Sequence, residues 1–394
     1  MIIPLKVNHM SKKQQSRVKD AFCQFLVLLT LLCPIFIAAD NSPYIYKVYQ
    51  FLPAPGQFVN VYPEYEDGDD TDDIIAKVEE QLCGDQKPGL ISLGGYGGYV
   101  VFGFDHSVVN VSGDYDFKIY GNAFSGSSEP GIVEVSVDEN GNGLPDDTWY
   151  ELAGSEYSNS NTILGYQIVY TRPDEDKEMD PDPDYAYVND RTYVPWSDNQ
   201  GNTGYVMRNI YHSQSYWPQW LDDTSLEFSG SRLPDNYTLN GSIYTLAAYD
   251  WGYVDNQPNS TDEGFNIDWA VDSLGNTVAL SSIDFIKVYT ALNQYCGWIG
   301  ETSTEVCGAE DLHPDESGIA LTYLDSAEAV IATCRNGILS ITTGNNFTAQ
   351  LYSVSGSTIA IFEVVQGTNT FDISVLPNGL YILATPTSSH KILR

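Results

Sequence analysis

A run of acids and amides alternating with glycine, DENGNGLPDD, occupies residues 138–147 and has the composition of a cation-binding loop. Its oxygen-bearing side chains stand at the first, third, fifth and ninth positions: Asp138, Asn140, Asn142 and Asp146. Oxygen ligands at this spacing can wrap around a hard cation, and Gly143 at the sixth position permits the sharp turn that such a loop needs. We therefore predict a calcium site formed by these side chains and the backbone carbonyl of Leu144.

The residues around this loop limit what the ion would do. The twelfth position holds Trp149 instead of the bidentate glutamate of a helical calcium loop, so Asp147 or Glu151 would have to substitute. No cysteine or histidine cluster lies nearby, which argues against zinc or a redox metal. Nothing close by would activate a water, so the expected role of calcium is structural. The alternative is a solvated Asn-Gly turn between two strands.

A second acidic region, YDWGYVDNQPNSTDEGFNIDW, follows residue 248. Its acids have irregular spacing, and they are either solvated loop residues or ligands of another ion: Asp250, Asp255, Asp262, Glu263 and Asp268.

A long insertion, residues 173–241, is dense in aromatic residues and poor in periodicity. Aromatic rings on a loop form flat platforms for sugar rings or a planar macrocycle. The predicted ligand-binding residues are Trp196, Arg208, Tyr211, His212, Tyr216, Trp217 and Trp220. The alternative is that these rings pack on one another as a small core for the loop.

Motifs of catalysis are missing from the sequence, which contains no GxSxG, HExxH or phosphate-binding loop. The 53 acidic residues guarantee coincidental carboxylate pairs, so such pairs carry no information without geometry. We predict no catalytic residues, and His106, which follows Asp105 in an expected strand, is interpreted as structural.

The charge and the N-terminus indicate export. The net charge of −35 disfavours nucleic acid as a partner. Residues 1–39 combine the basic MSKKQQSRVK, the apolar FLVLLTLLCPIFIA and a small-residue cleavage point near Ala39, which is the pattern of a signal peptide. In an oxidising compartment Cys296 and Cys307 either pair across a loop or remain thiols, and the sequence does not choose.

The elements that must position these residues are mostly strands. Residues 69–84 predict one helix, capped by Asp72 or Thr71, with Ile74, Ile75, Val78 and Leu82 on one face. Many short apolar runs separated by Gly, Asn, Asp and Pro predict an all-β sandwich for the rest.

Two stretches resemble known families. The segments DFKIYGN, EPGIVEVSVD and IDFIKVYTAL, in that order, resemble a jelly-roll module of bacterial cell-surface proteins. In the tail, LYSVSG at 351–356, LPNGLYIL at 376–383 and the terminal HKILR resemble the C-terminal sorting domain of the type IX secretion system of Bacteroidota.

The resemblance implies a jelly-roll-like β-sandwich at 40–308, carrying the insertion and one short helix, a linker at 309–333, and a small β-sandwich at 334–394. It also implies a location at the cell surface, on the outer-membrane exterior, and a TonB-dependent outer-membrane transporter as a possible partner. The expected function is non-catalytic capture of a glycan or other nutrient, with structural calcium. The alternatives are a carbohydrate-active hydrolase or lyase, a corrinoid-binding accessory of such a transporter, and a structural or adhesion protein.

Overall fold

The computed structural model describes residues 41–84, 89–314, 330–335, 338–343, 345–353, 358–377, 379–385 and 389–394. The predicted signal peptide lies outside these residues. Strands dominate both the part at 41–314 and the part at 330–394, so the predicted all-β class is confirmed. Each part is described by itself.

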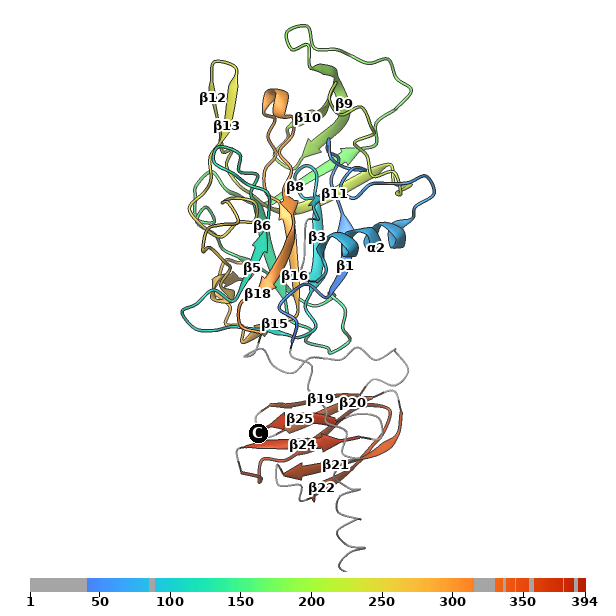
Figure 1. Cartoon of the computed structure of the whole chain (residues 1–394), viewed down its shortest axis with the longest axis vertical. Coiled ribbons are helices and arrows are strands. Elements are labelled where there is room, and N and C mark those ends of the chain that lie inside the picture. Colours follow the sequence, from blue (N-terminus) through green and yellow to red (C-terminus); the bar gives the residue numbers. More distant parts are fainter. Residues whose placement is uncertain are drawn as a thin grey trace, which may run out of the picture. The chain divides into compact units, whose positions relative to one another are not determined.

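A six-stranded antiparallel sheet organises the first part (Figure 1). Its order is β1 (Lys47–Leu52), β3 (Tyr99–Gly103), β16 (Phe285–Thr290), β6 (Gly131–Ser136), β7 (Trp149–Leu152) and β14 (Ala270–Val271). Alternate residues of a strand point to opposite faces, so the β-branched and aromatic residues of the central strands fill one face. That face carries Val100, Phe102, Val133, Val135, Ile286 and Val288, all buried in one core.

The layer that shares this core consists of short strand pairs. They are β5 (Phe117–Tyr120) with β18 (Gly308–Asp311), β2 (Ile91–Ser92) with β17 (Glu305–Val306), and β4 (Val108–Val109) with β15 (Ser282–Ile283). The arrangement is sandwich-like, but separate pairs replace the continuous second sheet expected of a jelly roll. Because β18 pairs with β5, residues 309–311 belong to this part and not to the predicted linker.

Helix α2 (Thr71–Leu82) packs against β1 (Figure 1). Asp70 is its N-cap, and its side chain accepts the backbone N–H groups of Asp72 and Asp73, so the predicted caps were one and two residues late. Ile74, Val78 and Leu82 are buried as predicted, whereas Ile75 is half-buried.

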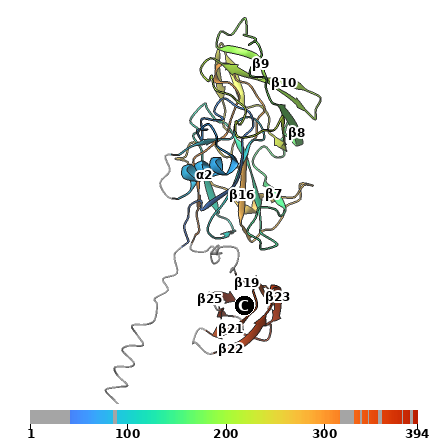
Figure 2. The same ribbon diagram turned by 90° about the vertical axis from the view of Figure 1, so that its right-hand side faces the viewer.

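The aromatic insertion belongs to a second sheet of its own. Its order is β10 (Thr203–Asn209), β9 (Val188–Asp198), β8 (Ile163–Thr171) and β11 (Ser225–Arg232), and Figures 1 and 2 show it at one end of the part at 41–314. This sheet begins before the predicted boundary at 173. A hairpin of β12 (Tyr237–Asn240) and β13 (Ile243–Leu246) follows, then the 3₁₀ turns η1 (Ile267–Trp269) and η2 (Gly297–Ile299).

The part at 330–394 is a small two-sheet unit. One sheet contains β19 (Val330–Arg335), β20 (Ile338–Thr343) and β23 (Gly367–Asp372), and the other contains β22 (Thr358–Val364), β21 (Phe347–Ser353), β24 (Leu380–Ala384) and β25 (Ser389–Leu393). Leu339, Ile341, Leu351 and Leu383 are fully buried in its core. The strand β19 begins four residues before the predicted boundary at 334.

Two further observations bear on export. Cys296 and Cys307 are both thiols, so the disulfide considered between them does not form. Among the described residues, no helix has the length and apolarity needed to span a bilayer.

Candidate functional site

A cavity of about 860 Å³ lies at the ends of several loops. Six aromatic side chains from five segments line it: Phe58, Tyr62, Phe124, Tyr211, Tyr244 and Trp298. We call it the aromatic pocket. Its size lies in the range of about 300–1,000 Å³ that small-molecule sites occupy.

Three of these rings are unusually accessible. Tyr211 is 67% exposed, Phe124 is 65% exposed and Trp298 is 56% exposed. Large aromatic side chains gathered around a concave surface favour ligand contact, because burying their faces against a ligand removes apolar area from water.

Local hydrogen bonds hold the segments that carry these rings. Trp298 lies in η2, which is closed by the Cys296 N–H donating to Gly300 O at 2.8 Å. The Tyr211 N–H donates to Asn209 Oδ1 at 2.9 Å, and Asn209 Nδ2 in turn donates to Gln57 Oε1 at 2.8 Å. The pocket walls are therefore tied to buried polar groups of the scaffold.

Three carboxylates meet at the floor of the pocket, and we call them the acidic triad: Glu129, Asp255 and Glu305. Their ligand oxygens all lie within 4.8 Å of one another. Glu129 and Glu305 line the pocket, and Asp255 is buried against them at 3% exposure. They come from the segment before β6, the loop after β13 and strand β17.

The orientation of the triad is fixed by donors behind it. Asp255 accepts the N–H of Asn122 at 2.7 Å through Oδ1 and the N–H of Glu305 at 3.1 Å through Oδ2. Glu305 Oε1 accepts the hydroxyls of Ser92 at 3.0 Å and Ser303 at 2.9 Å. These bonds satisfy part of the acceptor capacity and leave the carboxylates facing one another.

Burial controls the electrostatics of the triad. It raises the pKa of Asp255 to about 7, although hydrogen bonds from backbone N–H groups oppose the shift. Burial and then mutual repulsion raise the pKa of Glu129 and the pKa of Glu305 well above their ordinary range. Within the described residues, no lysine, arginine or histidine forms an ion pair with any of the three.

A fourth buried acid, Glu301, lies close by. Its Oε1 accepts the N–H of Gln57 at 2.5 Å, and its Oε2 is buried without a hydrogen-bond partner. Burial raises the pKa of Glu301 to about 8, and the charge of Glu301 is near enough to raise the pKa of Glu129.

The predicted calcium loop forms the connection between the paired strands β6 and β7. Asp138 accepts the N–H of Asn142 at 3.0 Å through Oδ1 and the N–H of Gly143 at 2.8 Å through Oδ2. The amides of Asn140 and Asn142 approach Asp146 Oδ1 at 3.0 and 3.2 Å. The four predicted side chains thus turn toward one another. Gly141 and Gly143 permit this wrap because both adopt positive φ, 71° and 72°.

Other oxygen atoms of this loop have definite roles. The carbonyl of Leu144 accepts the N–H of Asp146 at 2.9 Å, which closes a turn. Asp147 accepts the N–H of Glu139 at 3.0 Å and so belongs to the loop. Glu151 instead accepts the hydroxyl of Ser231 at 2.6 Å, away from the loop, which leaves Asp147 as the better substitute ligand.

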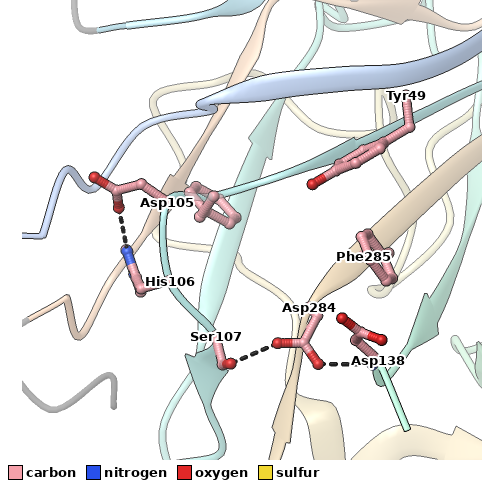
Figure 3. Close-up of a pocket in the computed structure, with 8 residues that line it drawn as sticks. Tyr49, Asp105, His106, Ser107, Asp138, Asp284 and Phe285 are labelled. Carbon is pink, nitrogen blue, oxygen red and sulfur yellow. Dashed lines mark hydrogen bonds and ion pairs between the residues drawn. The ribbon is translucent and has the colours of Figure 1, made fainter. Parts of the chain in front are cut away.

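Asp284 anchors the loop to the neighbouring strand (Figure 3). It accepts the N–H of Asp138 at 2.8 Å and the hydroxyl of Ser107 at 2.5 Å, beside a small cavity of about 20 Å³. Burial raises the pKa of Asp138, and the charge of Asp284 adds to that rise. A cation near Asp138 would relieve this repulsion.

The residues of the predicted aromatic site do not lie together: some line the aromatic pocket and others are buried in the insertion sheet. Tyr211 and His212 line the aromatic pocket, and His212 packs edge-on against Phe58 with ring centroids 4.8 Å apart. Tyr216 and Trp217 are 0% and 1% exposed in the core of the insertion sheet, so their faces are unavailable to a ligand.

The remaining three residues of that prediction also make internal contacts. Trp196 packs on the core of the insertion sheet, and Trp220 stacks on Phe51 at 6.2 Å. Arg208 lies over the ring of Tyr193 at 4.8 Å and pairs with Glu175 at 3.5 Å. Most of the predicted ligand-binding residues of the insertion therefore make internal packing contacts, which was the alternative to a binding surface.

Several residues of the pocket were missed by sequence reasoning. Asp255 belonged to the second acidic region, but its partners Glu129 and Glu305 come from elsewhere, and the other acids of that region do not join the triad. Trp298 lies between Cys296 and Cys307, the two cysteines considered for a disulfide. An aromatic residue beside glycines in a tight turn was the available signal.

Comparison with known proteins found a family match for the C-terminal residues of the chain. Residues 335–394 match the family described as the secretion system C-terminal sorting domain. This agrees with the resemblance to the type IX sorting domain of Bacteroidota and indicates a secreted or cell-surface protein. No curated protein matches the chain.

Proposed function

We propose that this exported protein captures a glycan in the aromatic pocket and does not convert it. The observation that carries the proposal is the convergence of six aromatic side chains around one cavity of about 860 Å³ with a polar floor. An exported protein that stays at the cell surface would meet polysaccharide fragments there, and a TonB-dependent transporter is the proposed partner that would receive them.

The pocket supplies the two kinds of contact that sugars use. The C–H faces of a pyranose ring pack on aromatic faces, for which the exposed rings of Tyr211 and Trp298 are suited. Sugar hydroxyls are donors to carboxylates, and Glu129 and Glu305 present carboxylates at the floor. A corrinoid, which is also planar and polar at its edge, is the alternative ligand for the same walls.

The Asp138 loop is part of the proposal as a structural calcium site. Its four side chains converge, and two backbone N–H groups already orient the carboxylate of Asp138. Calcium there would hold the connection between β6 and β7 on the acidic surface of the protein.

One observation favours a second candidate, a carbohydrate-active hydrolase or lyase. Burial raises the pKa of Glu301 to about 8, and a carboxyl that stays protonated near neutral pH is the group that a general acid requires. Incubation with polysaccharides followed by reducing-end and unsaturated-product assays separates the candidates: a binder releases neither product.

The binding proposal is tested by a glycan array followed by tryptophan fluorescence titration of the mature chain. Trp298→Ala should abolish array signals, whereas Trp251→Ala should retain them, because Trp251 is 37% exposed but lies outside the pocket lining. Equal array signals for the two variants would exclude the aromatic pocket as the binding site.

A further inference from the structure

We propose that Glu129, Asp255 and Glu305 bind a second calcium ion, distinct from any ion in the Asp138 loop, at the floor of the aromatic pocket. The inference does not depend on which ligand the pocket takes.

The spacing of the three carboxylates suits a single ion. Calcium binds oxygen at about 2.3–2.6 Å, so two ligands of one ion lie at most about 5 Å apart. All three ligand oxygens of the triad lie within 4.8 Å of one another, and therefore one ion can reach each of them.

The charge balance of the triad calls for a cation. Asp255 and Glu305 are 3% and 2% exposed, and the described residues supply no basic partner to any of the three. Burying like charges together is costly unless they are neutralised. Protons shared among the carboxyls are one solution, and a divalent cation is the other.

Glu301 provides an independent observation. Its Oε2 is buried without a hydrogen-bond partner, and the residue as a whole is only 6% exposed. Its other oxygen is held by Gln57, which lines the aromatic pocket, and its charge acts on Glu129. A buried carboxylate oxygen that lacks a partner, on a residue whose charge reaches Glu129, is a second indication of an ion, or of a water bound to an ion, at this floor.

The ligand atoms of the triad indicate which kind of metal ion it would bind. All three ligands are carboxylates, which suit hard cations, whereas zinc sites use histidine and thiolate ligands. Calcium tolerates irregular geometry and completes its shell with waters, and the pocket provides the entry path.

The supporting bonds resemble those of a preorganised site. Backbone N–H groups of Asn122 and Glu305 hold the two oxygens of Asp255, and two serine hydroxyls hold Oε1 of Glu305. Such bonds orient carboxylate ligands and lower the entropy lost when a metal binds.

The test is calcium titration by isothermal calorimetry at pH 7 with the full mature chain carrying Asp138→Ala. This protein should still bind one calcium ion per chain and should release protons on binding, which two buffers of different ionisation enthalpy reveal. Adding Glu305→Gln should abolish that binding. Adding Glu263→Gln, an isosteric change in the second acidic region and outside the triad, should leave it unchanged. Absence of calcium binding in the folded Asp138→Ala protein would overturn the proposal.

A melting experiment guards against a folding defect. In chelator, Glu305→Gln in the otherwise unchanged chain should melt at a higher temperature than the parent, because one of three mutually repelling buried carboxyls is gone. In calcium the order should reverse. The same order in both buffers would show that the triad shares protons and not a metal ion, whatever the outcome of the glycan array.

Discussion

Asp255 accepts the backbone N–H of Glu305 at 3.1 Å, although the two residues are 50 positions apart in the chain. Asp255 also accepts the N–H of Asn122, so one carboxylate joins three distant segments. The floor of the aromatic pocket is therefore built by long-range contacts of the sandwich, and its walls by the loops that these contacts hold.

The contact of His106 with two aspartates should make stability depend on pH. His106 lies between Asp105 and Asp311, with each ring nitrogen 2.6 Å from a carboxylate oxygen. Burial alone lowers the pKa of His106, but the hydrogen bonds to Asp311 and Asp105 outweigh it, so the net shift is upward from 6.5. The stabilisation is thus fully present below about pH 6.5 and is lost as the pH rises through the folded-state pKa.

Replacing His106 by Gln should therefore lower the melting temperature most at the acidic end of that window, and the difference from the parent should shrink as the pH rises. Asp311→Asn should cost about 3 kcal/mol, more than Asp105→Asn, because the side chain of Asp311 is 0% exposed and that of Asp105 is 29% exposed. A pH-independent difference between His106→Gln and the parent would refute the assigned charge state.

Glu301 should weaken the fold at alkaline pH. Its folded-state pKa is raised from 4.5 to about 8 by burial, so its favourable contribution is complete below pH 4.5 and is lost as the pH rises through about 8. Glu301→Gln keeps an acceptor for the Gln57 N–H and carries no charge. In calcium-free buffer above pH 8, thermal melting should show the variant several degrees more stable than the parent. The exposed control Glu227→Gln should show no such gain at any pH.

Calcium in the Asp138 loop should be visible as a chelator effect on melting. Chelator should lower the melting temperature of the parent by several degrees. Asp138→Ala should make this decrease smaller, because the variant has lost the stabilisation that calcium gives through the loop site. The matched control is Asp272→Ala, because Asp272 caps a similar exposed turn by accepting the N–H groups of Leu274 and Asn276. An undiminished chelator effect in Asp138→Ala would rule out calcium in the loop.

Replacing Trp217 and Trp298 should have very different effects on stability, because one ring belongs to the core and the other to the aromatic pocket. Trp217 is 1% exposed in the insertion core, so Trp217→Ala should cost about 3–5 kcal/mol of unfolding free energy. Trp298 is 56% exposed, so Trp298→Ala should change that free energy by less than about 1 kcal/mol. Chemical denaturation measures both, and a large loss for Trp298→Ala would mean that its ring supports the fold.

Local features were predictable from the sequence because neighbouring residues determine them. The turn at Asp138 depends on glycines and amides within ten positions, and the helix depends on the spacing of Ile74, Val78 and Leu82. The cap was misplaced by one or two residues because Asp70, Thr71 and Asp72 are all competent caps, and only the backbone geometry decides among them.

The pocket was not predictable because the type of a residue does not determine how exposed its side chain is or which distant residues it contacts. Trp217 and Trp298 are equally aromatic, yet one is covered by the insertion sheet and the other stands in a turn at the pocket. Glu129 and Glu305 meet only because β6 and β17 bring their segments to the same end of the sandwich. With so many acids in the chain, no local pattern singles these out.

The most direct test of the central claim is the dissociation constant of the strongest array glycan, measured by calorimetry for the mature chain and its variants. Tyr211→Ala and Trp298→Ala should each weaken binding at least about tenfold, as loss of a stacking platform worth about 1.4 kcal/mol requires. Tyr46→Ala, which removes a 54% exposed tyrosine outside the pocket lining, should leave the constant unchanged. Unaltered affinity in Tyr211→Ala and Trp298→Ala would contradict glycan capture by the aromatic pocket.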